Sequence, residues 1–369
     1  MKRAVVAAIS LMTGLTMLTG CSKAEVEETI QPLVADAIEE SDSEAEAVDE
    51  QDESPLIPEI DTDVKIEAGS RIAVVSKSVK GEYWKMVKKG MEDAVKAIND
   101  AYGFKKDDQI TMTFEGPDNE EDVESQINTI DAVIAENPDV RCISASDMDS
   151  CQAQLEAAKE NEIPVVAFDS NVSEKKLVKA YRGTDNVQVG KMAAYQLGSA
   201  LGKMGKVAVF SAQQKTKSVQ DRVEGFMNNI GKYGDIEVVE TIYSDQVDDM
   251  EASMKEVLEK YPTLDGVFCT NADITEMYLN LEKSDEHDAP ALVGVDATTK
   301  QQEAIRNGEE IGCVSQQPYA MGYQTIWAAV ETTAPKKSVV IEKNVLSNPA
   351  WIDADCLDDP DYSGYLYTE

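Results

Sequence analysis

Short runs of apolar and β-branched residues alternate along the chain with longer segments in which apolar residues recur every three or four positions. The short runs predict strands, and the periodic segments predict amphipathic helices. The expected strands cover residues 71–76, 110–114, 140–144, 164–168, 206–210, 236–240, 266–270, 291–295 and 311–315. The expected helices cover residues 82–99, 120–136, 149–161, 187–201, 218–230, 250–261, 273–281, 301–307 and 321–332. Such regular alternation is typical of an α/β fold in which helices cover both faces of parallel sheets.

The alternating pattern runs to residue 168 and then starts again, so the sequence predicts two similar lobes. Each lobe is expected to be a doubly wound, mostly parallel sheet with helices on both faces, and a three-strand hinge joins them. The crossovers are expected near Asp169, Gln316 and Glu342. The N-terminal lobe would then comprise residues 69–168 plus 317–342, and the C-terminal lobe residues 169–316 plus 343–369.

The first 20 residues have the features of a signal peptide. Two basic residues precede an uncharged, mostly apolar run from Ala4 to Met17, which is too short to span a bilayer comfortably. Leu-Thr-Gly-Cys at positions 18–21 follows and resembles the bacterial lipobox. This resemblance implies cleavage before Cys21 and lipidation of its thiol. We therefore expect a protein held by lipid on the extracytoplasmic face of the cell membrane.

Residues 21–68 form an acidic segment between the lipidated cysteine and the first expected strand. From Ser22 to Glu67 there are seventeen Asp and Glu against two Lys, with no Gly, Trp, Tyr or Phe. Such a segment buries too little apolar surface to offset its ordering entropy, and its like charges repel one another. We expect a disordered tether, with a partner-binding acidic segment as the alternative.

Charge and composition exclude several classes of function. The formal net charge of −36 argues against nucleic-acid binding and against a basic membrane-surface patch. The single histidine, His287, offers little for histidine-based catalysis. The spacing of the six cysteines fits neither a zinc site nor a dense disulfide framework. We expect no cofactor, no metal and a monomeric protein.

Two further features leave alternatives open. Cys142 lies in an expected strand and Cys151 opens the following helix, so buried free thiols are expected and a disulfide between them is the alternative. The acidic segment from Asp353 to Asp359 lacks the glycine and the spacing of an EF-hand loop. A solvated tail is expected there, and calcium binding is the alternative.

Polar residues follow most of the expected strands. In a parallel sheet the strand carboxyl ends lie at one edge, and ligands bind outside that edge. The sequence therefore predicts a polar ligand site at the strand ends. For Asp273 the alternative to ligand binding is helix capping, and for Asn171 it is a structural role in a turn. The candidates at strand ends are Ser76, Ser146, Asp147, Asp169, Asn171, Asn271, Asp273, Asp296 and Gln316.

A series of short motifs occurs in order at these strand ends. The motifs are Tyr83-Trp84 with Gly90, Asp147, Pro164 to Ser170, Thr184-Asp185-Asn186 with Gly190, Arg222 to Phe226, Asn271, Val293 to Asp296, and Gln316-Gln317-Pro318. Together they resemble the ribose- and galactose-type periplasmic binding proteins, the type I solute-binding family. The resemblance covers roughly residues 71–344, and it rests on the order of the motifs because each is weak alone.

The resemblance implies that a small sugar or sugar-like ligand binds between the two lobes. Carboxylates, amides and a guanidinium would bond its hydroxyls, and aromatic rings would cover its CH surface. Tyr83 and Trp84 match the stacking pair, and Asn171 is a further candidate. For Asp185 and Asn186 we expect helix capping, with ligand contact as the alternative. The expected ligand-binding residues are Tyr83, Trp84, Asp147, Asp169, Asn171, Arg222, Asn271, Asp296 and Gln316.

The chain departs from the family pattern near the expected site. Lys80-Gly81-Glu82 stands where the family often has Asn-Pro, and Asn271-Ala272-Asp273 stands where it usually has Asn-Asp. Val295 occupies the place of an aromatic residue that often precedes the late Asp. A polyol, a nucleoside or a furanosyl signalling molecule is therefore an alternative to a sugar.

The resemblance also implies a function in uptake. Hinge closure would trap the ligand, and the closed form would be recognised by the membrane permease of an ABC importer. The chain has no Walker-type phosphate-binding motif, so energy coupling belongs to partner proteins. The alternative is a sensing subunit for a membrane receptor kinase or chemoreceptor. A glycoside hydrolase using two of Asp147, Asp169 and Asp296 is a third hypothesis, but without any other catalytic pattern we expect a protein that is not an enzyme.

Overall fold

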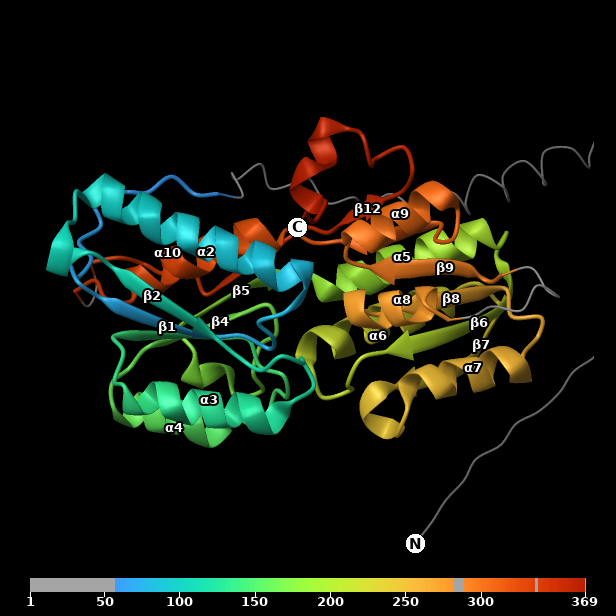
Figure 1. The fold of residues 1–369 in the computed structure, drawn as a ribbon, viewed down its shortest axis with the longest axis horizontal. Helices are drawn as coiled ribbons and strands as arrows, with labels where there is room; N and C mark the ends of the chain where they lie inside the picture. Colours follow the sequence, from blue (N-terminus) through green and yellow to red (C-terminus); the bar gives the residue numbers. More distant parts are fainter. Residues whose placement is uncertain (1–56, 282–288, 336–337, 369) are drawn as a thin grey trace, which may run out of the picture. The chain divides into compact units, whose positions relative to one another are not determined.

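The computed structural model describes residues 57–281, 289–335 and 338–368. This part of the chain forms two six-stranded, mostly parallel sheets with helices on both faces (Figure 1), which confirms the expected fold class. Cys21, the signal peptide and most of the acidic segment lie outside the described residues, as does His287.

The first sheet comprises β1 (Arg71–Val75), β2 (Thr111–Glu115), β3 (Val140–Ile143), β4 (Val165–Phe168), β5 (Ala180–Thr184) and β11 (Asn344–Ser347). Its strand order is β11-β5-β4-β3-β1-β2, and every pair is parallel. One face packs against α2 (Gly81–Tyr102) and α10 (Pro318–Glu331), and the other against α3 (Val123–Ala135) and α4 (Gln152–Glu160) (Figure 1). We call this sheet and its helices the first lobe.

The second sheet comprises β6 (Met204–Ser211), β7 (Asp235–Tyr243), β8 (Gly266–Cys269), β9 (Ala291–Val295), β10 (Gly312–Ser315) and β12 (Ala350–Ile352). Its order is β12-β10-β9-β8-β6-β7, and only the pair of β10 with β12 is antiparallel. Its helices are α5 (Asn186–Ala200), α6 (Lys217–Ile230), α7 (Met250–Lys260), α8 (Ala272–Leu279) and α9 (Thr299–Asn307). We call this sheet and its helices the second lobe. Short 3₁₀ turns cover residues 106–108, 175–177, 244–246 and 360–365.

The central strands are apolar at consecutive positions because both faces of each sheet are covered. In β1, Ile72 and Val74 belong to the core beneath α2 and α10, while Ala73 and Val75 belong to the core beneath α3 and α4. Side chains alternate between the two faces of a strand, so a continuous apolar run is what a doubly covered strand requires. These strands could be predicted from the sequence because burial on both faces requires a continuous apolar run.

Strands β5 and β11 lie in the first sheet, whereas the expected boundaries at residues 169 and 343 placed them in the second lobe. The chain therefore crosses between the sheets just after β5, after β10, and between β11 and β12. None of the strands β5, β11 and β12 was expected. In β5 the buried Arg182 interrupts the apolar pattern, and its guanidinium donates to the carbonyl oxygens of Tyr181 and Glu342. The edge strands β11 and β12 have only four and three residues.

The end of the expected tether is ordered. Tyr102 in α2 donates its hydroxyl to the carbonyl oxygens of Asp61 and Val64, and the side chains of Ile60 and Ile66 pack against the core of the first lobe. These two isoleucines supply the apolar surface that the acidic residues around them lack. The disordered tether expected for residues 21–68 is therefore wrong for residues 57–68.

Cys142 and Cys151 are buried and are not joined by a disulfide. Cys142 belongs to the core beneath α2 and α10, and Cys151 to the core on the opposite face of the sheet. The sheet separates the two thiols, which confirms the expectation of buried free thiols. Burial raises the pKa of the Cys151 thiol to about 11, so this thiol stays protonated and unreactive near neutral pH.

A pair of glycines brings two helices into close contact in each lobe. In the second lobe, a Cβ on Gly190 of α5 would lie 1.9 Å from the carbonyl oxygen of Arg222, and one on Gly225 of α6 would lie 2.2 Å from that of Val187. In the first lobe, Gly90 of α2 would meet the carbonyl oxygen of Tyr319 at 2.0 Å. Only a residue without a side chain permits this approach.

We predict that Gly190→Ala lowers the free energy of unfolding by about 1–3 kcal/mol, as overpacking of a tight contact typically does. The added methyl group must displace the backbone of α6. Midpoints of urea unfolding would measure the effect. Gly234→Ala is the control, because a Cβ there meets nothing within 4 Å. Equal midpoints for the two variants would contradict the close helix contact.

Candidate ligand-binding site

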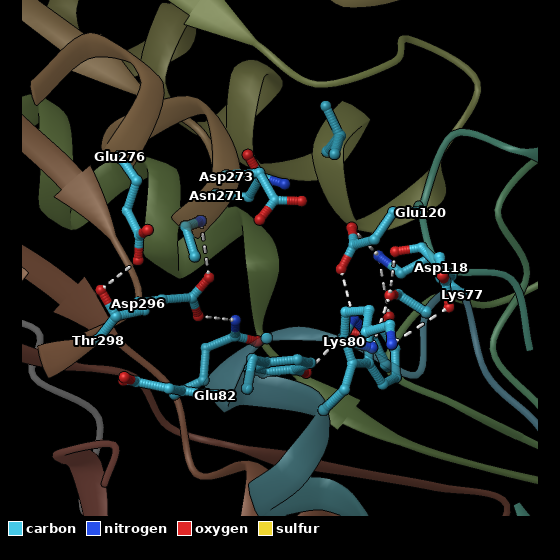
Figure 2. A pocket seen from close by; sticks show the side chains of 18 of the residues that line it. Lys77, Lys80, Glu82, Asp118, Glu120, Asn271, Asp273, Glu276, Asp296 and Thr298 are labelled. Atoms are coloured by element: carbon cyan, nitrogen blue, oxygen red, sulfur yellow. Dashed lines mark hydrogen bonds and ion pairs between the residues drawn. The ribbon is translucent and has the colours of Figure 1, made fainter. Parts of the chain in front are cut away.

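Segments that follow the strands of both sheets meet at one cavity. From the first lobe come the segments after β1, β2 and β4, and from the second lobe those after β6, β8, β9 and β10. The charged and polar side chains that line it are Lys77, Ser78, Lys80, Glu82, Asp118, Glu120, Asp169, Arg222, Asn271, Asp273, Glu276, Asp296, Thr298 and Gln316, together with Tyr83 and Trp84 (Figure 2). Strand carboxyl ends converge here because parallel strands share one direction.

The cavity has the size of a small polar molecule. Its volume is about 150 Å³, measured as the space open to the centre of a water molecule. A single water needs roughly 10–15 Å³ on that measure. The cavity therefore has room for a group of waters or for one small ligand, and an oligosaccharide would not fit inside it.

The structure brings seven of the nine expected ligand-binding residues to this cavity. These are Tyr83, Trp84, Asp169, Arg222, Asn271, Asp296 and Gln316. Asp147 and Asn171 do not line it. The Asp147 carboxylate accepts from the backbone N–H groups of Asp149 and Ser150 in the turn before α4, and Asn171 accepts from its own neighbour Val172. Both side chains are used in local turns.

Two expected capping assignments are resolved by the structure. Asp185 accepts from the backbone N–H of Gln188 and caps α5, as expected. At the start of α8 the cap is Asn271, which accepts from the N–H of Ile274 at 3.1 Å. Asp273, for which capping was the alternative, instead lies in the first turn of α8 and lines the cavity.

Asp169 is held by three side chains at the end of β4. Its carboxylate accepts from the hydroxyls of Tyr83 and Ser144, both at 2.7 Å, and pairs with the Lys77 ammonium at 3.1 Å. Burial alone would raise the pKa of Asp169, but Lys77 and the two hydroxyls hold it below its usual value. The carboxylate is therefore ionised and fixed in place at neutral pH.

Lys77, which the sequence analysis missed, also reaches a second carboxylate. Its ammonium lies 3.4 Å from Glu120 and 5.6 Å from the centre of the Trp84 ring, and the Trp84 indole N–H donates to Glu120 at 2.6 Å. Trp84 and Tyr83 are both mostly buried in the core of the first lobe while they line the cavity. The sequence did contain a signal for Lys77 as a site residue, because it directly follows the polar Ser76 at the end of an expected strand.

Asp296 occupies the corresponding place after β9 in the second lobe. One carboxylate oxygen accepts from the Gln316 amide at 2.7 Å and from the Tyr367 hydroxyl at 2.8 Å, and the other accepts from the backbone N–H of Ala272 at 3.1 Å. Both Asp169 and Asp296 have positive φ, at 54° and 79°. Non-glycine residues adopt this conformation rarely, and it is concentrated at functional sites.

Arg222 reaches the cavity from α6 with most of its side chain buried. Its Nε donates to Asn186 at 2.8 Å and its Nη1 donates to the carbonyl oxygen of Thr270 at 2.7 Å. These two bonds fix the guanidinium plane. Among the described residues Nη2 has no hydrogen-bond partner, so this group is available to a ligand.

The C-terminal segment beyond the acidic residues 353–359, for which a solvated tail was expected, contributes to the site. Tyr367 is fully buried, its hydroxyl donates to Asp296, and its ring centre lies 5.9 Å from that of Tyr83. The backbone holds it in place, because its N–H donates to Ala297 and its carbonyl oxygen accepts from Gln302. The three tyrosines at 362, 365 and 367, which follow the acidic residues 358, 359 and 361, were the signal for this packing.

Other possibilities for the site are limited by its chemistry. Among the described residues, no group of three His, Cys, Asp or Glu side chains is arranged to hold a metal ion. Within the same part of the chain, no helix combines the length and the apolar character needed to cross a membrane. The charged and polar side chains that line the cavity can bind a small polar molecule through hydrogen bonds and ion pairs.

Comparison with known proteins gives the family. The family model of the periplasmic binding protein domain matches residues 72–337, well over half of the chain. The chain belongs to the periplasmic binding protein family. Members of this family bind solutes and are not enzymes, which confirms the expectation of a non-enzymatic protein that acts outside the cytoplasm.

Individual relatives are distant but cover much of the chain. The ribose import binding protein RbsB of Bacillus subtilis is 24% identical over 60% of this chain and 71% of its own length. The D-allose-binding periplasmic protein of Escherichia coli is 22% identical over 75% of this chain and 88% of its own. A solute-binding protein of an ABC transporter from Agrobacterium vitis, solved with bound D-fucose, is 26% identical with a TM-score of 0.72, over 80% of this chain and 100% of its own.

We predict that Tyr367→Phe weakens ligand binding while the protein still folds. The substitution removes the hydroxyl that orients the Asp296 carboxylate and retains the ring against Tyr83. Loss of one hydrogen bond to a charged group should reduce affinity roughly tenfold or more. Tyr365→Phe is the control, because its hydroxyl makes only an exposed bond of 3.3 Å to Asn348. Isothermal titration of both variants would decide, and equal affinities would contradict the role of Tyr367.

Proposed function

We propose that this protein is the extracytoplasmic solute-binding component of an ABC importer and captures a small sugar or sugar-like molecule. The observation that carries the proposal is the convergence of polar strand-end residues of both lobes, with two aromatic side chains, on one cavity of monosaccharide size. The relatives named for ribose import and D-allose binding, and the neighbour with bound D-fucose, support this class of ligand.

The side chains of the cavity suit the chemistry of a sugar. A sugar offers hydroxyls that both donate and accept, and the cavity offers donors at Arg222 and Asn271 and acceptors at Asp169, Asp296 and Gln316. The faces of Trp84 and Tyr83 suit the CH groups of a ring. Polar contacts fix the orientation of the ligand, and aromatic contact supplies burial of apolar surface.

Capture would involve closure of the lobes around the ligand. Several hydrogen bonds join the lobes beside the cavity: Glu82 in α2 accepts from the backbone N–H of Thr299 in α9 at 2.7 Å, and Thr216 donates to the carbonyl oxygen of Ser146 at 2.6 Å. A ligand that contacts both lobes favours the state in which these bonds form, because only that state offers both sets of contacts. The permease would recognise this closed state.

We also propose that Cys21 carries a lipid and that the acidic segment holds the two lobes away from the membrane. The lipobox-like sequence at 18–21 supports the anchor. The net charge of −15 between Ser22 and Glu67, from seventeen acidic and two basic residues, supports an extended connection.

A panel of pentoses, hexoses, polyols and nucleosides, tested by thermal shift on residues 57–369, would identify the class of ligand. A ligand that binds only the folded protein raises the melting temperature. At a ligand concentration of one hundred times the dissociation constant, the added free energy of unfolding is about 2.7 kcal/mol. We expect a shift for at least one sugar or polyol. A panel without any shift would contradict the proposed function.

The identified ligand would then test the site. Asp296→Ala and Arg222→Ala should abolish the shift, because each removes a fixed group at the cavity. Asp147→Asn should retain it, because the Asp147 carboxylate lies in a turn outside the cavity. Urea unfolding would establish that each variant is folded. Retained binding in both alanine variants would show that the ligand binds elsewhere.

Cys21→Ala tests the anchor separately from ligand binding. We expect the unsubstituted protein to fractionate with membranes of a bacterial host that processes lipoproteins, and the variant to be released into the soluble extracytoplasmic fraction. Ligand binding by the released variant should be unchanged, because Cys21 precedes the folded lobes. Membrane association of both forms would contradict lipidation at this position.

A further inference from the structure

The charges around the cavity are unevenly paired between the two lobes. In the first lobe the two lysines have acidic partners: Lys77 pairs with Asp169 and Glu120, and Lys80 lies 3.7 Å from Asp118. Three of the four carboxylates on this side of the cavity therefore have a lysine partner, and the fourth, Glu82, accepts from the backbone N–H of Thr299.

The second lobe contributes an acidic wall, which we define as Asp273, Glu276 and Asp296. Within the described part of the chain, none of the three carboxylates has a lysine or arginine within ion-pair distance. Lys300, the nearby cation, donates to the backbone carbonyl of Glu276 and to the side chain of Asn280. The acidic wall therefore lacks the compensation found in the first lobe.

Asp273 is the least satisfied member of the acidic wall. Among the described residues its carboxylate has no hydrogen-bond or ion-pair partner, and Figure 2 shows it directed into the cavity. Burial, with repulsion from Glu120, Glu276 and Asp296, raises the pKa of Asp273 to about 7. Asp273 is exposed to solvent, so repulsion from the neighbouring carboxylates is the firmer of the two causes. A cation placed here would relieve that repulsion.

A separate observation shows that this side of the cavity lacks a donor. Gln316 is 3% exposed and lines the cavity. The Gln316 amide nitrogen donates to Asp296, so the Gln316 Oε1 takes no part in that bond. Among the described residues this Oε1 has no hydrogen-bond partner. The wall thus combines negative charge with an unpaired neutral acceptor, and both match a group that only donates.

A primary ammonium is such a group, since it carries one positive charge and three donors and has no acceptor. A divalent metal ion would also be positive, but no group of three ligating side chains is arranged for one in the described residues. Arg222 also lines the cavity, but its single positive charge leaves the three carboxylates of the acidic wall in excess.

We propose that the ligand is an amine-bearing sugar or polyol whose ammonium group binds against Asp273, Glu276 and Asp296 while its hydroxyls contact the first lobe and Arg222. This inference rests on the proposed function and specifies the class of ligand within it. The sugar ring occupies the part of the cavity beside Trp84, and the ammonium occupies the part beside Gln316 and the acidic wall.

The experiment compares each amino sugar with its parent, in which a hydroxyl replaces the amine. Isothermal titration at about pH 7.5, above the pKa of Asp273, would use 2-amino-2-deoxyhexoses and other aminodeoxy sugars with their parent hexoses and pentoses. We expect at least one amino sugar to bind about tenfold or more tightly than its parent, the scale of a hydrogen-bonded charge pair. Parents that bind as tightly as every amino sugar would overturn the inference and leave the proposed function standing. Absence of binding by both groups would overturn the proposed function as well.

Asp273→Asn tests whether the acidic wall causes the preference for an amino sugar over its parent. The change preserves size and removes one negative charge, so the affinity for the amino sugar should fall about tenfold while that for the parent changes little. Glu92→Gln is the matched control, since it removes one charge from the exposed face of α2, where Glu92 pairs with Lys88. A variant that weakens the amino sugar and its parent equally would overturn the role of the Asp273 charge.

Discussion

The ion pair between Lys77 and Asp169 lies almost entirely out of solvent, and the first lobe's half of the cavity depends on it. Removing one partner of such a pair leaves a buried charge and typically costs about 3–5 kcal/mol. Here the pair joins the segments after β1 and β4, and hydroxyls from Ser144 and Tyr83 add β3 and α2. Four elements are thereby held in register, and the orientation of Trp84 and Glu120 follows from the position of Lys77. This half of the cavity is organised before any ligand arrives.

The second lobe repeats the geometry with different chemistry. Asp296 has the same place after a strand and the same left-handed backbone as Asp169, but its partners are neutral: an amide, a hydroxyl and a backbone N–H. A neutral set of donors fixes the carboxylate and leaves its charge uncompensated. The two lobes are thus similar in fold, but lysine ion pairs hold the carboxylates of the first lobe and neutral donors hold Asp296 in the second.

Sequence reasoning succeeded where a residue's role follows from its place after a strand. Asp169, Asn271, Asp296 and Gln316 reach the cavity because the strand ends converge there. The same rule failed for Asp147, since a carboxylate that binds its own turn has the same sequence pattern as one that faces a ligand. The same rule also missed β5. The buried Arg182 in this strand donates hydrogen bonds to carbonyl oxygens that only the fold brings close to it. Tyr367 depends on packing between segments some 70 residues apart, which local patterns do not encode.

The position of Tyr367 links the two lobes through a single side chain. Residues 77–316 supply every side chain that lines the cavity, yet Tyr367 donates to the Asp296 carboxylate from outside that range. Its ring also belongs to the apolar core beneath α2 and α10. Proteolytic trimming of the C-terminal segment would therefore disturb the core of the first lobe and the carboxylate of the second at once.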